Sequence, residues 1–319
     1  MPMPLGGQMT AHWDVVGVGV NTVDLLAVVD AFPAPDTKHE LRALSELPGG
    51  ETATALAACA RLGWRARYVG RFGSDLRGQT ARIDLANSGV DLSACTTAAA
   101  AQAVSVIFVD NQGRRTVLWS RSLELDLQPA DVDPAVVTAG RILLSDAHQP
   151  EAATHAARCA RTAGIPTILD IDSTGAGRDA LLRETDILIT SADFPEAFTG
   201  KSALGAALRA LAGEFRPRLV CTTLGRHGSL ALVEDREIRT EGFDVPVVDS
   251  TGAGDAFRGG FVAGWLASAG TSAGTPQVEA VLTYANAVAA LACRRLGARS
   301  GLPTVDEVAR LLTSNRRTA

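Results

Sequence analysis

Short apolar runs rich in β-branched residues recur along the chain and predict buried strands. The first run occupies residues 14–20 and ends in glycines. After about residue 129, such runs alternate with segments of helical periodicity. Near-continuous apolar strands that alternate with helices are typical of a parallel sheet covered by helices on both faces. We expect the other strands of this sheet at residues 65–69, 141–144, 166–170, 187–190 and 218–223.

Segments with apolar residues three and four positions apart predict the helices between these strands. Gly63 is expected to end the first helix, and Gly89 the second, because glycine commonly follows the last helical turn. We expect helices at residues 52–62, 75–89, 151–163, 179–182, 194–198, 203–214, 256–269, 278–296 and 305–312. A β-hairpin is expected at residues 228–243.

Two stretches of half-exposed alternation, at about residues 24–47 and 103–121, do not fit this rhythm. The second contains the turn signal Asp110 to Gly113, which predicts a hairpin. We expect both stretches to form a small separate sheet that acts as a lid, because lids over α/β sites exclude water. The alternative is an extension of the main sheet.

The pattern therefore predicts one α/β domain over residues 12–313. Its expected architecture is a three-layer sandwich with a central, mainly parallel sheet, plus the small β-sheet lid. Residues 1–11 show no such pattern and are expected to form a flexible tail.

Composition narrows the class of protein. The chain has 319 residues, of which 46% are hydrophobic and 20% charged, which is ordinary for a globular protein and unlike a disordered one. A formal net charge of −5 argues against a nucleic-acid partner, since that affinity depends on clustered Lys and Arg. No apolar run reaches the ~18 residues of a membrane span, and no signal peptide is recognisable. We expect no membrane partner and a cytoplasmic location.

Cysteine and lysine usage limits the chemistry further. Five cysteines lie at wide spacings without a Cys-x-x-Cys pair, which argues against a disulfide framework or a zinc site and favours a reducing compartment. Only two of the 30 basic residues are lysines, Lys38 and Lys201. A mechanism that requires lysine therefore has two candidates.

One hexapeptide, Asp-Ser-Thr-Gly-Ala-Gly, occurs at residues 172–177 and again at 249–254. Each copy follows an expected strand and precedes an expected helix. This arrangement directs backbone N–H groups and a helix dipole towards an anion. The loop 223–228 also ends a strand, and by itself it is either a simple turn or a phosphate cradle.

The second copy continues into Asp255, which places a carboxylate beside the expected anion cradle. Such a carboxylate fits a general base, which takes a proton from a hydroxyl while the amides hold the phosphoryl group that the hydroxyl attacks. The alternative is an acidic residue that only complements the helix dipole, worth ~0.3–1 kcal/mol. The residues alone leave both interpretations open.

Several motifs together resemble the ribokinase-like (PfkB) sugar kinases. Residues 48–63, with Gly49-Gly50 at their start, resemble the N-terminal signature of that family, and residues 249–257 its C-terminal signature. Residues 70–78 resemble the segment between them, and residues 223–228 the nucleotide loop. The order and spacing agree over residues 14–312, which is nearly the whole chain.

The resemblance implies a reaction and a cofactor. In this family ATP, with Mg²⁺, phosphorylates a sugar hydroxyl, usually a primary one. Asp255 is then the general base, and the amides of Gly252, Ala253 and Gly254 form the anion hole for the transferring phosphoryl group. Phosphoryl transfer depends mostly on positioning and charge stabilisation. The family lid is often a dimer interface, so a homodimer is expected.

The resemblance also implies binding residues. Asp24 matches the sugar-binding Asp of the family, while Gly49 and Gly50 allow the backbone to approach the sugar. The implied contacts to ATP are Thr223, Gly225, Gly228 and, near the adenine, Asn286. Asp249 and Thr251 imply a monovalent cation site, with K⁺ as its ion.

Three departures from the family pattern affect these expectations. The Asn-x-x-Glu motif that helps to organise Mg²⁺ is replaced by residues 191–194, and Asp193 is the substitute that we expect. Glu51 and Thr54 stand where the family has two Asn residues, of which Thr54 remains a candidate sugar contact. These two replacements argue against assuming that the substrate is ribose or a plain hexose. Asp172, in the first hexapeptide, either opens a helix or helps to position a Mg²⁺-bound water or the sugar.

Two basic residues near the lid bear on the substrate. Lys38 is either a solvated charge or a contact to an acidic sugar. Arg121 follows the lid hairpin and could reach the substrate or a phosphate. The expected substrate is accordingly a monosaccharide or a sugar acid.

Two rival functions remain at this stage. A nucleoside kinase would need an aromatic lid, and only 5% of residues are aromatic. A catalytically silent regulator that binds a sugar or nucleotide would explain the lost Asn-x-x-Glu motif. The intact residues 252–255 argue against it, because a silent relative is free to lose its base.

Overall fold

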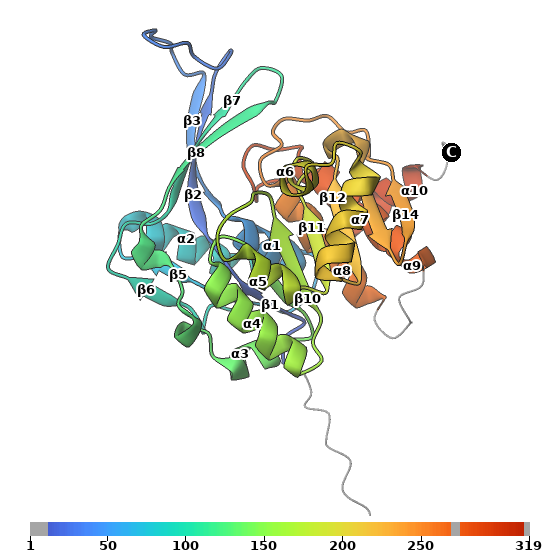
Figure 1. The fold of residues 1–319 in the computed structure, drawn as a ribbon. Helices are drawn as coiled ribbons and strands as arrows, with labels where there is room; N and C mark the ends of the chain where they lie inside the picture. The colour runs from blue at the N-terminus through green and yellow to red at the C-terminus, as the bar shows by residue number, and fades with distance from the viewer. Residues whose placement is uncertain (1–11, 269–274, 316–319) are drawn as a thin grey trace, which may run out of the picture.

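The computed structural model describes residues 12–268 and 275–315. The expected flexible tail, residues 1–11, lies outside the described residues. An eight-stranded sheet forms the centre of the molecule, with strand order β14-β13-β12-β11-β10-β9-β1-β4 (Figure 1). Its strands are β1 (Val15–Val18), β4 (Ala66–Val69), β9 (Leu143–Asp146), β10 (Thr167–Ile171), β11 (Ile187–Thr190), β12 (Leu219–Thr223), β13 (Ser229–Val233) and β14 (Arg236–Thr240).

Neighbouring strands from β4 to β12 are parallel, whereas β13 is antiparallel to both β12 and β14. One layer of helices contains α3 (Pro134–Thr138), α4 (Pro150–Thr162), α5 (Arg178–Arg183), α6 (Phe194–Thr199) and α7 (Leu204–Phe215). The other contains α1 (Glu51–Arg61), α2 (Leu76–Asn87), α8 (Ala253–Ala267), α9 (Thr275–Ala292) and α10 (Val305–Asn315).

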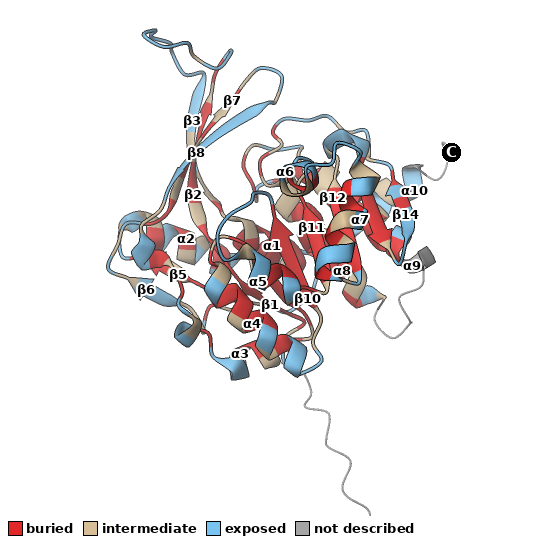
Figure 2. Ribbon diagram, viewed as in Figure 1, coloured by how far each residue is buried: buried red, intermediate tan, exposed pale blue. Residues whose placement is uncertain are grey.

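Alternate residues of each strand supply the two cores between sheet and helices. Val15 and Ile168 pack in the cluster that includes α1 and α8, whereas Val16 and Leu169 pack in the cluster that includes α4 and α7. Successive side chains of a strand point to opposite faces of its sheet, so a strand that is covered on both faces is apolar throughout. The central strands are accordingly buried (Figure 2). The expected mainly parallel α/β sandwich is confirmed.

The lid is a separate four-stranded sheet that projects from the body of the molecule (Figure 1). Its strands are β2 (Thr22–Val28), β3 (Ala43–Gly49), β7 (Val104–Val109) and β8 (Arg115–Ser120), in the order β3-β2-β7-β8. β2 pairs in antiparallel fashion with β3 and in parallel with β7, and β7 and β8 form the expected hairpin. The lid is therefore not an extension of the main sheet.

Some boundaries differ from the expected ones. Strand β3 ends at Gly49, two residues beyond the expected lid stretch, and includes Pro48. Proline is tolerated there because β3 is an edge strand, where the missing N–H breaks no ladder. Helix α8 begins at Ala253, three residues earlier than expected. The short strands β5 (Arg71–Gly73) and β6 (Thr96–Ala98) and the single-turn helices η1 (Leu123–Leu125), η2 (Pro129–Asp131) and η3 (Gly225–His227) were not expected.

Among the described residues, no helix combines the length and the apolarity that a membrane span requires.

Candidate active site

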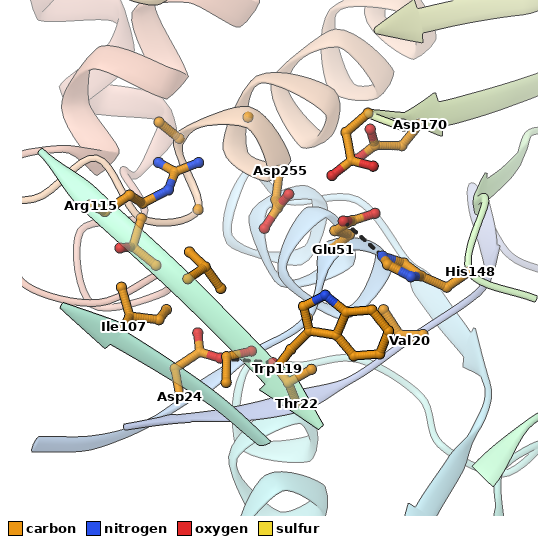
Figure 3. Close-up of a pocket in the computed structure, with 18 of the residues that line it drawn as sticks. Val20, Thr22, Asp24, Glu51, Ile107, Arg115, Trp119, His148, Asp170 and Asp255 are labelled. Atoms are coloured by element: carbon orange, nitrogen blue, oxygen red, sulfur yellow. Dashed lines mark hydrogen bonds and ion pairs between the residues drawn. The ribbon is translucent and has the colours of Figure 1, made fainter. Parts of the chain in front are cut away.

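A cleft of about 640 Å³ lies between the lid and the carboxyl ends of the central strands (Figure 3). Residues at or just beyond the ends of β9 to β12 line it, namely His148, Asp170, Asp172, Ser191 and Thr223. The N-termini of α1 and α8 and the inner face of the lid complete the wall. The carboxyl edge of a parallel sheet is where α/β proteins bind ligands.

The start of α8 has the geometry that an anion cradle requires. Gly252 caps the helix with φ of 73°, a left-handed conformation, and a Cβ there would lie 2.6 Å from the Cα of Ala298. Only glycine meets both conditions. The amides of the first helical turn have no partner four residues earlier in the helix, although Ala253 N–H donates to the Ser250 carbonyl at 3.2 Å. The cradle therefore offers N–H groups and the positive end of a 15-residue helix.

Asp255 lies in the first turn of α8 and lines the cleft. Burial, followed by the charge of Glu51, raises the pKa of Asp255 to about 7, while Arg258 and Arg115 act in the opposite direction. A general base is most effective when its pKa lies near the working pH. The electrostatics of the cleft therefore suit Asp255 to proton transfer.

Asp24 lies on the opposite side of the cleft, in lid strand β2. The Thr22 hydroxyl donates to its Oδ1 at 2.9 Å, and burial raises the pKa of the Asp24 carboxyl. Any side chain at Gly49 would collide with this carboxylate. The glycine therefore allows the backbone of β3 to approach Asp24 closely.

Glu51 and His148 form a charged pair inside the cleft. Glu51 is the first residue of α1, and its Oε1 lies 3.0 Å from Nε2 of His148. Burial disfavours the imidazolium, but the hydrogen bond and charge of Glu51, with Asp146 and Asp172, raise the pKa of His148 to about 10. The imidazole is accordingly positively charged at neutral pH.

The lid contributes aromatic and basic side chains. Trp119 of β8 lies edge-on to His148 with the ring centroids 6.3 Å apart. Arg115 crosses from β8 to the cradle and donates to the Ser250 carbonyl at 2.6 Å. Arg121 pairs with Asp126 at 2.8 Å and donates to the His148 carbonyl. Hydrogen bonds from Arg115 and Arg121 thus connect the lid segment to the Ser250 and His148 carbonyls on either side of the cleft.

The structure brings most of the sequence-predicted site residues to this one cleft. They are Asp24, Gly50, Arg121, Thr223, Gly225, Thr251, Gly252, Ala253, Gly254 and Asp255. Gly49 lies directly behind Asp24. These residues come from both ends and the middle of the chain.

Other sequence-predicted residues do not line the cleft. Lys38 is exposed in the loop between β2 and β3. Thr54 is fully buried and accepts a hydrogen bond from Nε of Arg299. A side chain at Gly228 would collide with the carbonyl of Thr240. Asn286 is buried in α9, where its Nδ2 donates to Ser229, Thr240 and Glu241, so it fastens the β13–β14 hairpin.

The acidic residues that were expected to bind metal ions do not line the cleft either. Asp193 is exposed at the start of α6, away from the cleft lining. Asp249 is buried, and its carboxylate accepts bonds from Thr251 and from Gly297 N–H, each at 2.8 Å. Among residues 12–268 and 275–315, no cluster of three or more His, Cys, Asp or Glu side chains could hold a metal ion.

The cleft residues that sequence reasoning missed include Arg115, Trp119, His148, Asp170 and Arg258. Asp170 had a signal, since it is a carboxylate near the end of an expected strand. Arg258 lies three residues after Asp255 on the same helix, which predicts a shared face. His148 and Trp119 had no distinguishing signal, because their neighbours come from distant segments.

A mainly parallel sheet under a β lid, with a glycine-capped helix and a carboxylate at one cleft, defines a class of small-molecule phosphotransferases. Residues 14–305 match the family described as pfkB family carbohydrate kinase. The chain belongs to this family, and it is therefore a phosphotransferase that acts on a sugar hydroxyl.

Individual relatives agree with this assignment. The chain is 32% identical over 306 residues to the ATP-dependent ribose-1-phosphate kinase of Halopiger xanaduensis, covering 94% of this chain and 98% of that protein. A crystal structure from Agrobacterium tumefaciens, provisionally described as a ribokinase, is 26% identical with a TM-score of 0.87, covering 96% and 99% of the two chains. The fold is also that of the fructokinase with bound ATP from Xylella fastidiosa, at 23% identity, a TM-score of 0.82 and coverage of 95% and 99%.

Proposed function

We propose that the protein transfers the γ-phosphoryl group of ATP to a primary hydroxyl of a monosaccharide or sugar derivative, with Asp255 as the general base. The observation that carries the proposal is the convergence of Asp255, the glycine-capped start of α8 and Asp24 on one cleft. A single sugar could then contact the binding carboxylate and the base together.

The reaction is a displacement at phosphorus. The hydroxyl oxygen forms a bond to the γ-phosphorus, the bond to the bridging oxygen breaks, and ADP leaves with that electron pair. Asp255 accepts the hydroxyl proton. The amides of Gly252, Ala253 and Gly254 stabilise charge on the phosphoryl oxygens, which is where such catalysis gains most.

Thr223 and Gly225 line the cleft and are proposed to contact ATP. Bound Mg²⁺ would neutralise phosphate charge. Mg²⁺ commonly uses one or two carboxylates together with substrate phosphates, so the lack of a three-residue cluster among the described residues fits such a site. Asp172 is the fitting carboxylate, because it is exposed and lines the cleft. Asp249 and Thr251 remain the proposed K⁺ position.

The protein is further proposed to be cytoplasmic and to form a homodimer. All five cysteines are free thiols, which supports the cytoplasm, where ATP is also available. Exposed apolar side chains on the lid, such as Leu44 and Leu118, support a homodimer through the lid.

The first test measures ADP release with ATP and Mg²⁺ across a panel of sugars. The panel contains ribose, fructose, a 2-keto-3-deoxy sugar acid and, because of the Halopiger relative, ribose 1-phosphate. Nucleosides are included because Trp119 places an aromatic ring at the cleft. Asp255→Ala is expected to lower turnover by ~10²–10⁴ or more with ATP binding nearly unchanged.

The matched control is Asp306→Ala. Asp306 is likewise acidic in the first turn of a helix, α10, but it is exposed and away from the cleft. Equal effects of the two variants would mean that Asp255 only complements a helix dipole. ATP binding without turnover of any sugar would favour a silent regulator instead.

A further inference from the structure

Arg258 and Asp170 form a buried ion pair in the wall of the cleft. Arg258 lies on α8, three residues after Asp255, and Asp170 lies near the end of β10. The contact joins Nη2 of Arg258 to Oδ1 of Asp170, and the two side chains are only 6% and 7% exposed. The pair therefore lies directly next to the proposed base.

Stability alone does not account for this pair. Removing two charges from water costs free energy that their attraction often fails to offset, and apolar residues can replace such pairs without loss. The Nε atom of Arg258 is buried without a hydrogen-bond partner among the described residues. A buried arginine that leaves a donor unsatisfied points to a role in the site.

The guanidinium lies against the anion cradle. A Cβ atom at Gly254 would collide with Nη1 of Arg258. Glycine at position 254 thus lets the arginine charge approach the first turn of α8. The positive charge is held where the helix dipole is also positive.

Charged groups from several elements face Asp255. Glu51 of α1 and Asp24 of β2 disfavour its ionised form, while Arg258 and Arg115 favour it. The other charged groups that line the cleft are Arg121, His148, Asp170 and Asp172. Arg115 is exposed on the lid, so solvent screens its charge. Arg258 is buried and fixed by Asp170, so its charge acts more strongly.

We propose that Arg258 is a positioning residue for phosphoryl transfer: Asp170 holds its guanidinium against Gly254, where a fixed positive charge supports both the Asp255 carboxylate and the transferring phosphoryl group. This inference rests on the proposed function, in which Asp255 is the base. It assigns the Arg258–Asp170 pair a role in the reaction besides a role in the fold.

The test compares Arg258→Met with the double variant Arg258→Met/Asp170→Asn. The single variant leaves a buried carboxylate without its partner and is expected to be strongly destabilised. The double variant removes both charges and is expected to have a Tm close to that of the wild type. We expect its kcat to fall about 10- to 100-fold. The acid limb of its kcat/KM profile is expected to move to higher pH, because Arg258 is among the charges that act most strongly on Asp255, whereas Asp170 is not.

A matched control removes the charges of an exposed pair with the corresponding substitutions. Arg209→Met/Glu237→Gln breaks the ion pair between α7 and β14, and it should change neither kcat nor the pH profile. A folded Arg258→Met/Asp170→Asn protein with wild-type kcat and an unmoved acid limb would overturn the inference.

A second readout does not depend on turnover. The difference in Tm between Asp255→Asn and its parent, followed over pH, reports the titration of Asp255, because only the parent can ionise there. In the Arg258→Met/Asp170→Asn background the midpoint is expected at a higher pH. An unchanged midpoint refutes the inference even if no sugar is phosphorylated. Failure of Asp255→Ala to lose activity, by contrast, refutes the proposed function.

Discussion

At the scale of single residues, Glu51 affects the protonation of two other cleft residues, His148 and Asp255. Its carboxylate pairs with His148 at 3.0 Å and is also the neighbouring charge that most raises the pKa of Asp255. The resemblance to the family implies a sugar-contacting Asn at this position. A negative charge here therefore changes the protonation of Asp255, the proposed base, as well as the surface that the cleft would present to a sugar.

We expect Glu51→Gln to move the acid limb of the kcat/KM profile to lower pH. Without the negative neighbour, the pKa of Asp255 falls from about 7 towards its ordinary value, so the base stays deprotonated in more acidic solution. The measurement is kcat/KM between pH 5 and 9. The same profile for Glu196→Gln, an exposed acid on α6, serves as the control, and an unmoved or raised limb for Glu51→Gln contradicts the electrostatic argument.

At the scale of elements, two helices direct their N-termini into the cleft, and each is preceded by a glycine with positive φ. Gly50 caps α1 with φ of 97°, and Gly252 caps α8 with φ of 73°. Left-handed caps let the chain turn sharply from strand to helix. The backbone conformation at these two positions thus places Glu51 and Asp255 in one site.

We expect Gly252→Ala to lose both stability and activity. A Cβ there meets strain from the positive φ and also lies 2.6 Å from the Cα and Cβ of Ala298, so the cradle must shift. The expected cost is about 1–3 kcal/mol of unfolding free energy with at least a tenfold loss of kcat, measured by denaturation and by ADP release. Gly63→Ala is the matched control, because Gly63 has φ of 90° with no atom within 4 Å of a Cβ. Gly63→Ala should lower the unfolding free energy through backbone strain alone and leave kcat unchanged.

At the scale of the whole molecule, the lid has two different faces. Residues 115, 117 and 119 of β8 face the cleft, and Arg115 reaches the Ser250 carbonyl. Alternation along the strand places Leu118 on the opposite face, where it is 56% exposed. Exposed apolar side chains on a sheet that projects from the body favour an interface with a second copy.

We expect Leu118→Glu to convert a dimer to a monomer, because a charge in an apolar interface is costly to desolvate. Light scattering coupled to size-exclusion chromatography measures the mass directly. Ile83→Glu, which alters a 61% exposed side chain on α2 outside the lid, should leave the mass unchanged. A wild-type protein that is monomeric at micromolar concentration would contradict the lid dimer.

The sequence by itself determined most of the local structure and located the proposed anion cradle. Apolar runs and helical periodicity predicted the central strands, because burial on one or both faces fixes which positions are apolar. The repeated hexapeptide and the residues that follow it predicted a carboxylate, Asp255, beside the proposed anion cradle, since a glycine-capped helix start is a local property of the chain.

The tertiary structure alone decided which distant side chains meet. The order of the strands and the packing of the helices place Asp170 against Arg258, and His148 against Glu51. Asn286 and Thr54 instead make hydrogen bonds outside the cleft. Lys38, which the sequence offered as a ligand for an acidic sugar, lies exposed in a lid loop. The physical reason is that contact, burial and local charge depend on the packing of remote segments, and these in turn set the pKa of a carboxyl group such as that of Asp255.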